Sequence, residues 1–137
     1  MKKILVVDHN QDVLRRVGLV LKVYCERPAT PIQPVAELCE SADEAIEAIE
    51  RHQPDILFLG YSFNENNTGG TGETVAQWID GNYESTYKKP IIVATHILRS
   101  EEEAKRLFAA AKCVKHFMGI ENHPQKIRKF LEDHLGK

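Results

Sequence analysis

Polar residues that can do chemistry follow three apolar runs of the sequence. Asp8 and His9 come directly after the first run, residues 60–62 (Gly-Tyr-Ser) after the second, and Thr95 and His96 after the third. A carboxylate and two imidazoles are ligands that transition metals accept, so Asp8, His9 and His96 would form a metal site if the fold brought them together. The alternative is a solvated polar edge without a bound ion, and the absence of any metal-ligand spacing favours it.

The apolar runs indicate the strands of a parallel sheet. Residues 4–7, 56–59 and 91–94 are apolar at every position, which is typical of strands buried on both faces. Two weaker runs, residues 35–39 and 114–120, are further candidate strands. Because the carboxyl ends of parallel strands meet at one edge of a sheet, the polar residues that follow them are expected to share that edge. We call this edge the rim, and it consists of residues 8–10, 60–62 and 95–96.

Segments of helical period separate these runs. Ser41 and Glu44 have the spacing of a capping box, and apolar residues then recur at helical intervals. Ser100 begins a second box, and Pro124 suits the first turn of the last helix. The chain therefore predicts five β-α units in one domain, residues 1–137. The predicted fold class is α/β, a flavodoxin-like three-layer sandwich with a five-stranded parallel sheet in the order 2-1-3-4-5.

Composition excludes several classes of protein. The 137 residues include 18 Lys and Arg against 20 Asp and Glu, so there is no basic excess to attract nucleic acid or an anionic membrane. The longest apolar stretches without charge, residues 56–64 and 90–98, are too short to span a bilayer. Asp8 interrupts the N-terminal apolar run, so a signal peptide is not expected, and we predict a cytoplasmic protein. The three cysteines lie far apart and suggest neither a zinc site nor a disulfide framework.

Four local patterns follow one another in an order that is typical of one family. They are residues 3–8 (KILVVD), 53–59 (QPDILFL) and 90–95 (PIIVAT), and the aromatic Phe117 before Met118. Together they resemble the receiver domain of two-component response regulators, over essentially the whole chain. In that family a phosphoryl group passes from a histidine kinase to an aspartate after the third strand. Acids after the first strand hold Mg²⁺ there, and a lysine after the fifth strand neutralises the phosphoryl oxygens.

The sequence departs from this pattern at the positions that carry the chemistry. Gly60 occupies the position of the phosphate acceptor, His9 that of the second acid, and Ile120 that of the lysine. Lys115 comes too early in the chain to replace that lysine. We therefore predict no catalytic residue, no phosphorylation on aspartate, and no cofactor. Bound Mg²⁺ is also not expected, because Asp8 is the one acid left to hold it.

Asp8, Thr95 and Phe117 are the members of the family's functional set that remain. The resemblance implies that they keep positions of its phosphorylation switch. The simpler interpretation is structural, with Asp8 as a helix cap, Thr95 as the end of a strand, and Phe117 packed under a helix.

Residues 62–74 form a longer loop than a receiver normally has. Its part 68–74 contains threonines and glycines and is similar to the phosphate-binding loop of flavodoxins, which suggests an alternative function as a small-ligand domain for FMN, a nucleotide or another anion. In flavodoxins, however, that loop follows the first strand, so a connecting loop is favoured here, with Thr71 as N-cap. Residues 27–34 hold three prolines and are predicted to be a stiff surface connector.

The resemblance also suggests where partners bind. The usual contact surface of receivers corresponds here to residues 100–111, 114–120 and 124–135. Basic side chains gather in this third of the chain, among them Arg106, Lys115 and Lys126. The alternative is that these charges are merely solvated. The sequence thus favours a non-enzymatic signalling module that binds a signalling protein, or a second copy of itself, through this surface.

Overall fold

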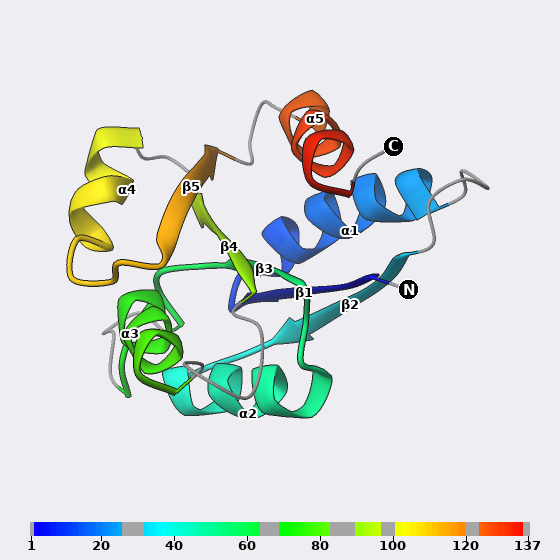
Figure 1. The fold of residues 1–137 in the computed structure, drawn as a ribbon. Helices are drawn as coiled ribbons and strands as arrows, with labels where there is room; N and C mark the ends of the chain where they lie inside the picture. Colours follow the sequence, from blue (N-terminus) through cyan, green and yellow to red (C-terminus); the bar gives the residue numbers. More distant parts are fainter. Residues whose placement is uncertain are drawn as a thin grey trace.

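The computed structural model describes residues 2–25, 32–63, 69–82, 90–96, 101–119 and 124–135. In these ranges strands and helices alternate along the chain (Figure 1). The strands are β1 (Lys2–Asp8), β2 (Ile32–Leu38), β3 (Ile56–Leu59), β4 (Ile91–His96) and β5 (Val114–Gly119). The helices are α1 (Gln11–Cys25), α2 (Ala42–His52), α3 (Gly72–Asn82), α4 (Glu101–Leu107) and α5 (Pro124–Leu135). None of these described helices has the length and apolar character needed to cross a membrane.

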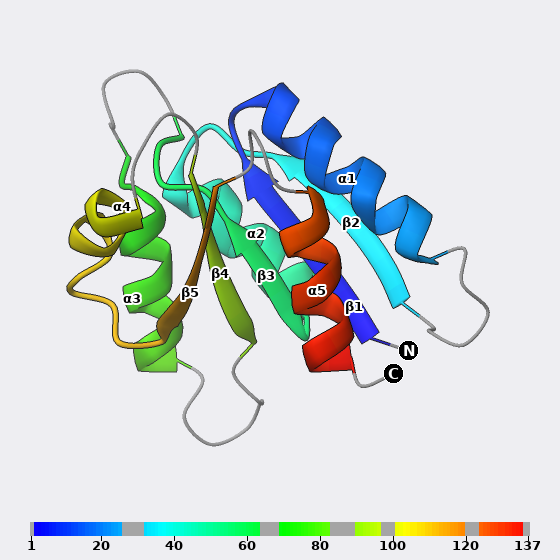
Figure 2. The same cartoon turned by 90° about the horizontal axis from the view of Figure 1, so that it is seen from above.

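The strands form one parallel sheet in the order β2-β1-β3-β4-β5, which confirms the predicted fold class. Helices α1 and α5 cover one face of the sheet and α2 and α3 the other, while α4 lies beside β4 and β5 (Figures 1 and 2). Because helices cover both faces, the apolar residues of β1 and β3 are buried whichever way they point.

Alternate residues of each strand belong to different cores. In β1, Leu5 and Val7 pack in the core on the α2 and α3 face, whereas Ile4 and Val6 pack in the core under α1 and α5. All four side chains are completely buried. This alternation follows from the two-residue period of a strand, and it explains why the sequence shows continuous apolar runs.

Helix α2 has the predicted capping box at its N-terminus. The hydroxyl of Ser41 accepts a hydrogen bond from the backbone N–H of Glu44, and the Glu44 carboxylate accepts one from the N–H of Glu40. The helix ends at Gln53, which has left-handed backbone angles and donates its N–H to the carbonyl of Ile49. The sequence pattern therefore located the start of this helix.

Asp55 holds the beginnings of three strands together. Its carboxylate accepts the N–H of Lys3 at 2.8 Å, its own N–H donates to the Lys3 carbonyl, and its carbonyl accepts the N–H of Ile91. The aspartate of the QPDILFL pattern is therefore a structural residue at the amino end of the sheet, opposite the rim.

Two predicted boundaries were wrong. Residues 32–34 belong to β2 and not to a surface connector, and Pro34 pairs in register with Ile4 of β1. Proline is accepted in β2 because this strand lies at the edge of the sheet, where a missing N–H costs no ladder bond. The rest of the proposed connector, residues 27–31, lies outside the described residues.

The fourth helix is shorter than the predicted range 100–111. It ends at Leu107, and the chain continues through a turn in which Ala109 donates to the carbonyl of Arg106 and Ala111 to that of Phe108. Phe108 and Ala111 are nevertheless buried, as the apolar pattern predicted. The apolar spacing therefore predicted which residues are buried, but it did not predict where the helix ends. Ser100, the proposed first residue of the second capping box, lies outside the described residues.

Candidate functional site

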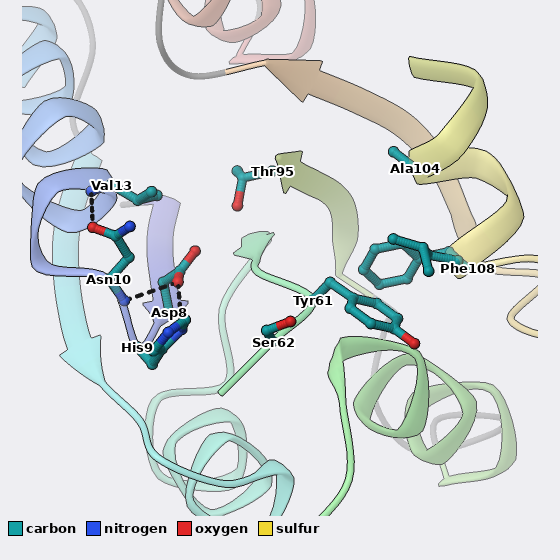
Figure 3. A pocket seen from close by; sticks show the side chains of 10 residues that line it. Asp8, His9, Asn10, Val13, Tyr61, Ser62, Thr95, Ala104 and Phe108 are labelled. Atoms are coloured by element: carbon teal, nitrogen blue, oxygen red, sulfur yellow. Dashed lines mark hydrogen bonds and ion pairs between the residues drawn. The ribbon is translucent and has the colours of Figure 1, made fainter. Parts of the chain in front are cut away.

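A cavity of about 220 Å³ opens at the carboxyl end of the sheet (Figure 3). It lies at the predicted rim, at the switch point between β1 and β3. From this point the chain continues to β2 on one side of the sheet and to β4 on the other. Residues that follow β1 and β3, together with the end of β4, supply its polar wall, and helices supply most of its apolar wall. The described residues that line it are Asp8, His9, Asn10, Val13, Tyr61, Ser62, Thr95, Ala104, Leu107 and Phe108.

Asp8 is the buried acid of this cavity. Its residue surface is 6% exposed, and its Oδ1 accepts the N–H of Asn10 at 3.0 Å and lies 3.5 Å from Nδ1 of His9. Loss of water around the carboxylate raises its pKa, and this effect outweighs the Asn10 hydrogen bond and the attraction of His9, which act in the opposite direction. Asp8 is therefore a carboxylate whose ionised form is poorly solvated.

The Asp8 carboxylate occupies the space in which a side chain at position 60 would lie. A Cβ atom at position 60 would lie 2.7 Å from Cγ of Asp8, and closer still to its Oδ2. The backbone of Gly60 has no left-handed φ angle, so the obstacle to a side chain is the neighbouring carboxylate and not the backbone conformation. With Asp8 in this position, no side chain fits at position 60, which the resemblance assigns to the phosphate acceptor.

Gly72 brings the start of α3 against the end of β3. Its N–H donates to the carbonyl of Tyr61 at 2.6 Å. A Cβ atom at this position would lie 3.0 Å from the carbonyl carbon of Gly60 and from Cζ of Phe108, and closer still to the Gly60 oxygen. Only a glycine permits this approach, because the nearest atoms belong to the backbone.

Thr95 contributes a buried hydroxyl to the cavity. It is 4% exposed, and its Oγ1 has no hydrogen-bond partner within the described structure. The hydroxyl points into the open space between Asp8 and the aromatic wall (Figure 3). A buried hydroxyl without a partner is uncommon, and it indicates that something else in the cavity satisfies it.

Three aromatic rings connect the cavity with β5. The ring of Tyr61 meets that of Phe108 edge to face at 5.5 Å between centroids, and Phe108 meets Phe117 at 6.3 Å. We call these three residues the aromatic row. Phe117 itself is half-buried and does not line the cavity, so the structure separates it from Asp8 and Thr95 but links it to them through Phe108.

The remaining site predictions fall into two groups. Arg106, Lys115 and Lys126 are exposed, on α4, β5 and α5 respectively. Ile120 and the side chain of His96 lie outside the described residues. Among the described residues, no three His, Cys, Asp or Glu side chains lie together as they would around a metal ion.

The Thr/Gly loop uses its own amides internally. Gly72 donates to Tyr61, Val75 donates to the Thr71 carbonyl, and the N–H of Thr71 donates to the hydroxyl of Thr74 at 3.1 Å. The amides of Thr71 and Gly72, at the N-terminus of α3, are among those that a phosphate bound there would need, whereas that of Val75 belongs to the first turn of the helix. The arrangement therefore does not favour the alternative prediction of an FMN, nucleotide or anion site at residues 68–74, of which Thr68 lies outside the described residues.

Sequence reasoning placed the polar lining at the rim but missed the helical lining. Val13 comes from α1, and Ala104, Leu107 and Phe108 come from α4 and the turn after it. The apolar spacing of residues 104–111 indicated that they are buried, but spacing within a helix does not distinguish a core from a cavity wall. These residues line the cavity because α4 lies beside β4.

No family model matches the sequence, and no curated protein matches it. Solved structures do match. A BeF3-activated N-terminal receiver domain of RstA from Klebsiella pneumoniae is 19% identical, with a TM-score of 0.69, and the match covers 99% of this chain and 100% of that one. A CheY-like receiver domain from Methylobacillus flagellatus is 11% identical, with a TM-score of 0.70 and coverage of 97% and 98%.

A third similar chain comes from the co-crystal structure of the Saccharomyces cerevisiae phosphotransfer protein Ypd1 and the receiver domain of its response regulator Ssk1. It is 15% identical, with a TM-score of 0.71 and coverage of 96% of this chain and 87% of that one. Over nearly its whole length, the chain therefore has the fold of response regulator receiver domains. The predicted family resemblance is confirmed at the level of the fold.

Substitution of Asp8 by asparagine is expected to stabilise the protein at neutral pH. The pKa of Asp8 is raised in the folded state, so its ionised form lowers stability above that pKa, and this cost disappears as the pH falls and the carboxyl is protonated. Asp8→Asn removes the cost and keeps the oxygen that accepts from Asn10. Urea unfolding at pH 7 is expected to show a gain of about 1 kcal/mol, shrinking towards pH 4.

The matched control for this prediction is Asp12→Asn, which changes an exposed acid at the start of α1. It is expected to change the free energy of unfolding by less than about 0.5 kcal/mol. A loss of stability in Asp8→Asn at pH 7 would mean that the ionised carboxylate holds the rim together.

Proposed function

We propose that the chain is a receiver-like signalling module that takes no phosphoryl group on aspartate and acts by binding proteins. It is not an enzyme in this proposal. Its fold is that of receivers, and the acceptor position is Gly60, with the carboxylate of Asp8 over it. This last observation carries the proposal, because it removes both the nucleophile and the space in which a phosphoryl group would be attached.

The metal chemistry of receivers is also poorly supported by these residues. Mg²⁺ prefers several hard oxygen ligands with negative charge among them, whereas the described cavity lining offers one carboxylate, that of Asp8, beside the imidazole of His9. The other oxygen-bearing side chains of this lining, Asn10, Tyr61, Ser62 and Thr95, are uncharged amides and hydroxyls. No lysine or arginine lines the described part of the cavity to balance the charge of a phosphoryl group. A role for Mg²⁺ is therefore not part of the proposal.

Intact-mass measurement after incubation with acetyl phosphate and Mg²⁺ tests the proposal directly. The expected spectrum shows unmodified protein, while a receiver that retains its aspartate, treated in parallel, gains the mass of one phosphoryl group that hydroxylamine removes. A hydroxylamine-labile phosphoryl group on the present chain would refute the proposal.

The proposed interaction surface consists of α4, β5 and α5. β5 is an edge strand of the sheet, with α4 on one side and α5 on the other (Figure 2). Arg106, Lys115 and Lys126 expose basic charge on these three elements. The proposed occupant is a signalling protein or a second copy of the chain. One of the similar receivers was co-crystallised with a phosphotransfer protein, which supports a protein partner.

Reversal of two of these charges is expected to weaken self-association. Arg106→Glu with Lys115→Glu alters exposed residues only, so the circular dichroism spectrum and the free energy of unfolding should change little. The dissociation constant of the self-association, measured by sedimentation velocity at low salt, is expected to rise about tenfold. Added salt should likewise weaken the self-association of the unmodified protein.

Reversal of the exposed Arg15 and Lys22 on α1 is the matched control, because it changes the net charge equally on a different face. It is expected to leave self-association unchanged. If association survives the first pair of reversals and is lost in the control, the interface lies on the α1 side of the molecule.

A further inference from the structure

The rim cavity has an unsatisfied polar wall. Thr95 points its hydroxyl into the cavity without a partner in the described structure, and Asp8 presents a buried carboxylate to the same space (Figure 3). The partners that the structure gives Asp8 are the Asn10 amide and the backbone and ring of His9, all on the loop that directly follows it. His9 is a cation only when it is protonated. No lysine or arginine lies in the described lining. The cavity thus carries negative charge that no permanent cation among its described lining residues neutralises.

The opposite wall is apolar and aromatic. Tyr61 and Phe108 present rings that meet at 5.5 Å, and Ala104 and Leu107 of α4 add apolar surface, while Val13 lies beside Asn10 on the side of Asp8 (Figure 3). Aromatic rings attract ammonium groups through their faces and pack against apolar groups. An inorganic ion would leave this wall without contact, and an anion would be repelled by Asp8.

The size of the cavity limits what it can hold. Sites for drug-sized molecules measure about 300–1,000 Å³, and this one measures about 220 Å³, so a ligand of fragment size is the largest that fits. Such a ligand must combine a hydrogen-bond donor with positive charge and a compact apolar group.

We propose that the rim cavity binds a small amphipathic amine in its ammonium form. The ammonium group donates hydrogen bonds to the carboxylate of Asp8 and to the hydroxyl oxygen of Thr95, and the apolar part packs against Tyr61 and Phe108. This binding does not depend on the proposed signalling role, because it requires neither phosphorylation nor a protein partner.

Three probes of the same shape and different charge test the proposal. Phenethylamine is cationic at pH 7, 2-phenylethanol is neutral, and phenylacetate is anionic. Each is titrated into the full chain labelled with ¹⁵N, and binding is followed through the amide resonances of Asn10, Tyr61 and Ser62. We expect phenethylamine to bind with a dissociation constant on the order of 1 mM, as suits a ligand of this size, and at least about tenfold more tightly than either analogue.

Variants of the chain distinguish binding through the proposed contacts from non-specific binding. Asp8→Asn, which is expected to fold at least as stably as the unmodified chain, should weaken phenethylamine about tenfold or more. Thr95→Val keeps the shape of the side chain and should weaken it several-fold, while Asp12→Asn should have no effect.

The proposal is overturned if the three probes bind equally, which would indicate an apolar pocket without charge selection. It is also overturned if Asp8→Asn leaves phenethylamine binding unchanged, or if Mg²⁺ shifts these resonances while phenethylamine does not. A failure of the amine proposal would leave the result of the acetyl phosphate test unaffected. Phosphorylation of the chain would refute the proposed function but would not by itself exclude amine binding.

Discussion

Replacement of Gly72 by alanine is expected to lower the free energy of unfolding by about 3 kcal/mol, or about 10 °C in melting temperature. The added methyl group would run into the carbonyl of Gly60 and the ring of Phe108. Neither can move freely, because Gly60 donates its N–H to Val7 in the buried β1 strand and Phe108 packs against Tyr61 and Phe117. Thermal and urea unfolding followed by circular dichroism measure the loss.

Gly18→Ala is the control for that experiment. Gly18 lies inside α1, and a Cβ atom there would meet nothing within 4 Å. Alanine is the better helix former, so this change is expected to raise the free energy of unfolding by about 0.5–1 kcal/mol. A Gly72→Ala variant that loses less than about 0.5 kcal/mol would show that α3 does not approach β3 as closely as the structure has it.

The second large effect is a coupling between positions 8 and 60. Gly60→Ala alone is expected to destabilise the protein by about 2 kcal/mol, because its methyl group and the Asp8 carboxylate claim the same space. In a chain that also carries Asp8→Ala the same change should cost much less. A double-mutant cycle of the two alanine substitutions is expected to give a coupling energy of about 1–2 kcal/mol.

The same contact decides what happens when the acceptor is restored. Gly60→Asp places a second carboxylate directly against the first, so we expect reduced stability and no hydroxylamine-labile phosphoryl group after treatment with acetyl phosphate. By the resemblance to receivers, His9 and Ile120 would also still occupy the positions of the second acid and of the lysine. Additive stabilities in the cycle, or robust phosphorylation of Gly60→Asp, would contradict this account.

Local patterns predicted most of this fold. Continuous apolar runs indicated the three central strands because a strand covered on both faces must be apolar on both. The box at Ser41 and Glu44 located the start of α2 because its two hydrogen bonds are local. The edge strands were less well defined, since one side of each faces no other strand, and Pro34 therefore obscured the beginning of β2.

Local sequence patterns could not predict the cavity. The polar rim followed from the rule that strand ends share an edge, but the side chains from α1 and α4 that close the cavity depend on how distant helices pack. The contact between Asp8 and the Gly60 position is likewise tertiary: the two residues are far apart in sequence, and neither residue type alone indicates that one fills the space of the other. Sequence reasoning singled out position 60, but not that the Asp8 carboxylate occupies the space beside it.

The shared space at positions 8 and 60 means that a side chain can enter at position 60 only if the Asp8 carboxylate turns away or is removed. Position 8 is therefore the first place at which a compensating substitution is expected in any variant that carries a side chain at position 60.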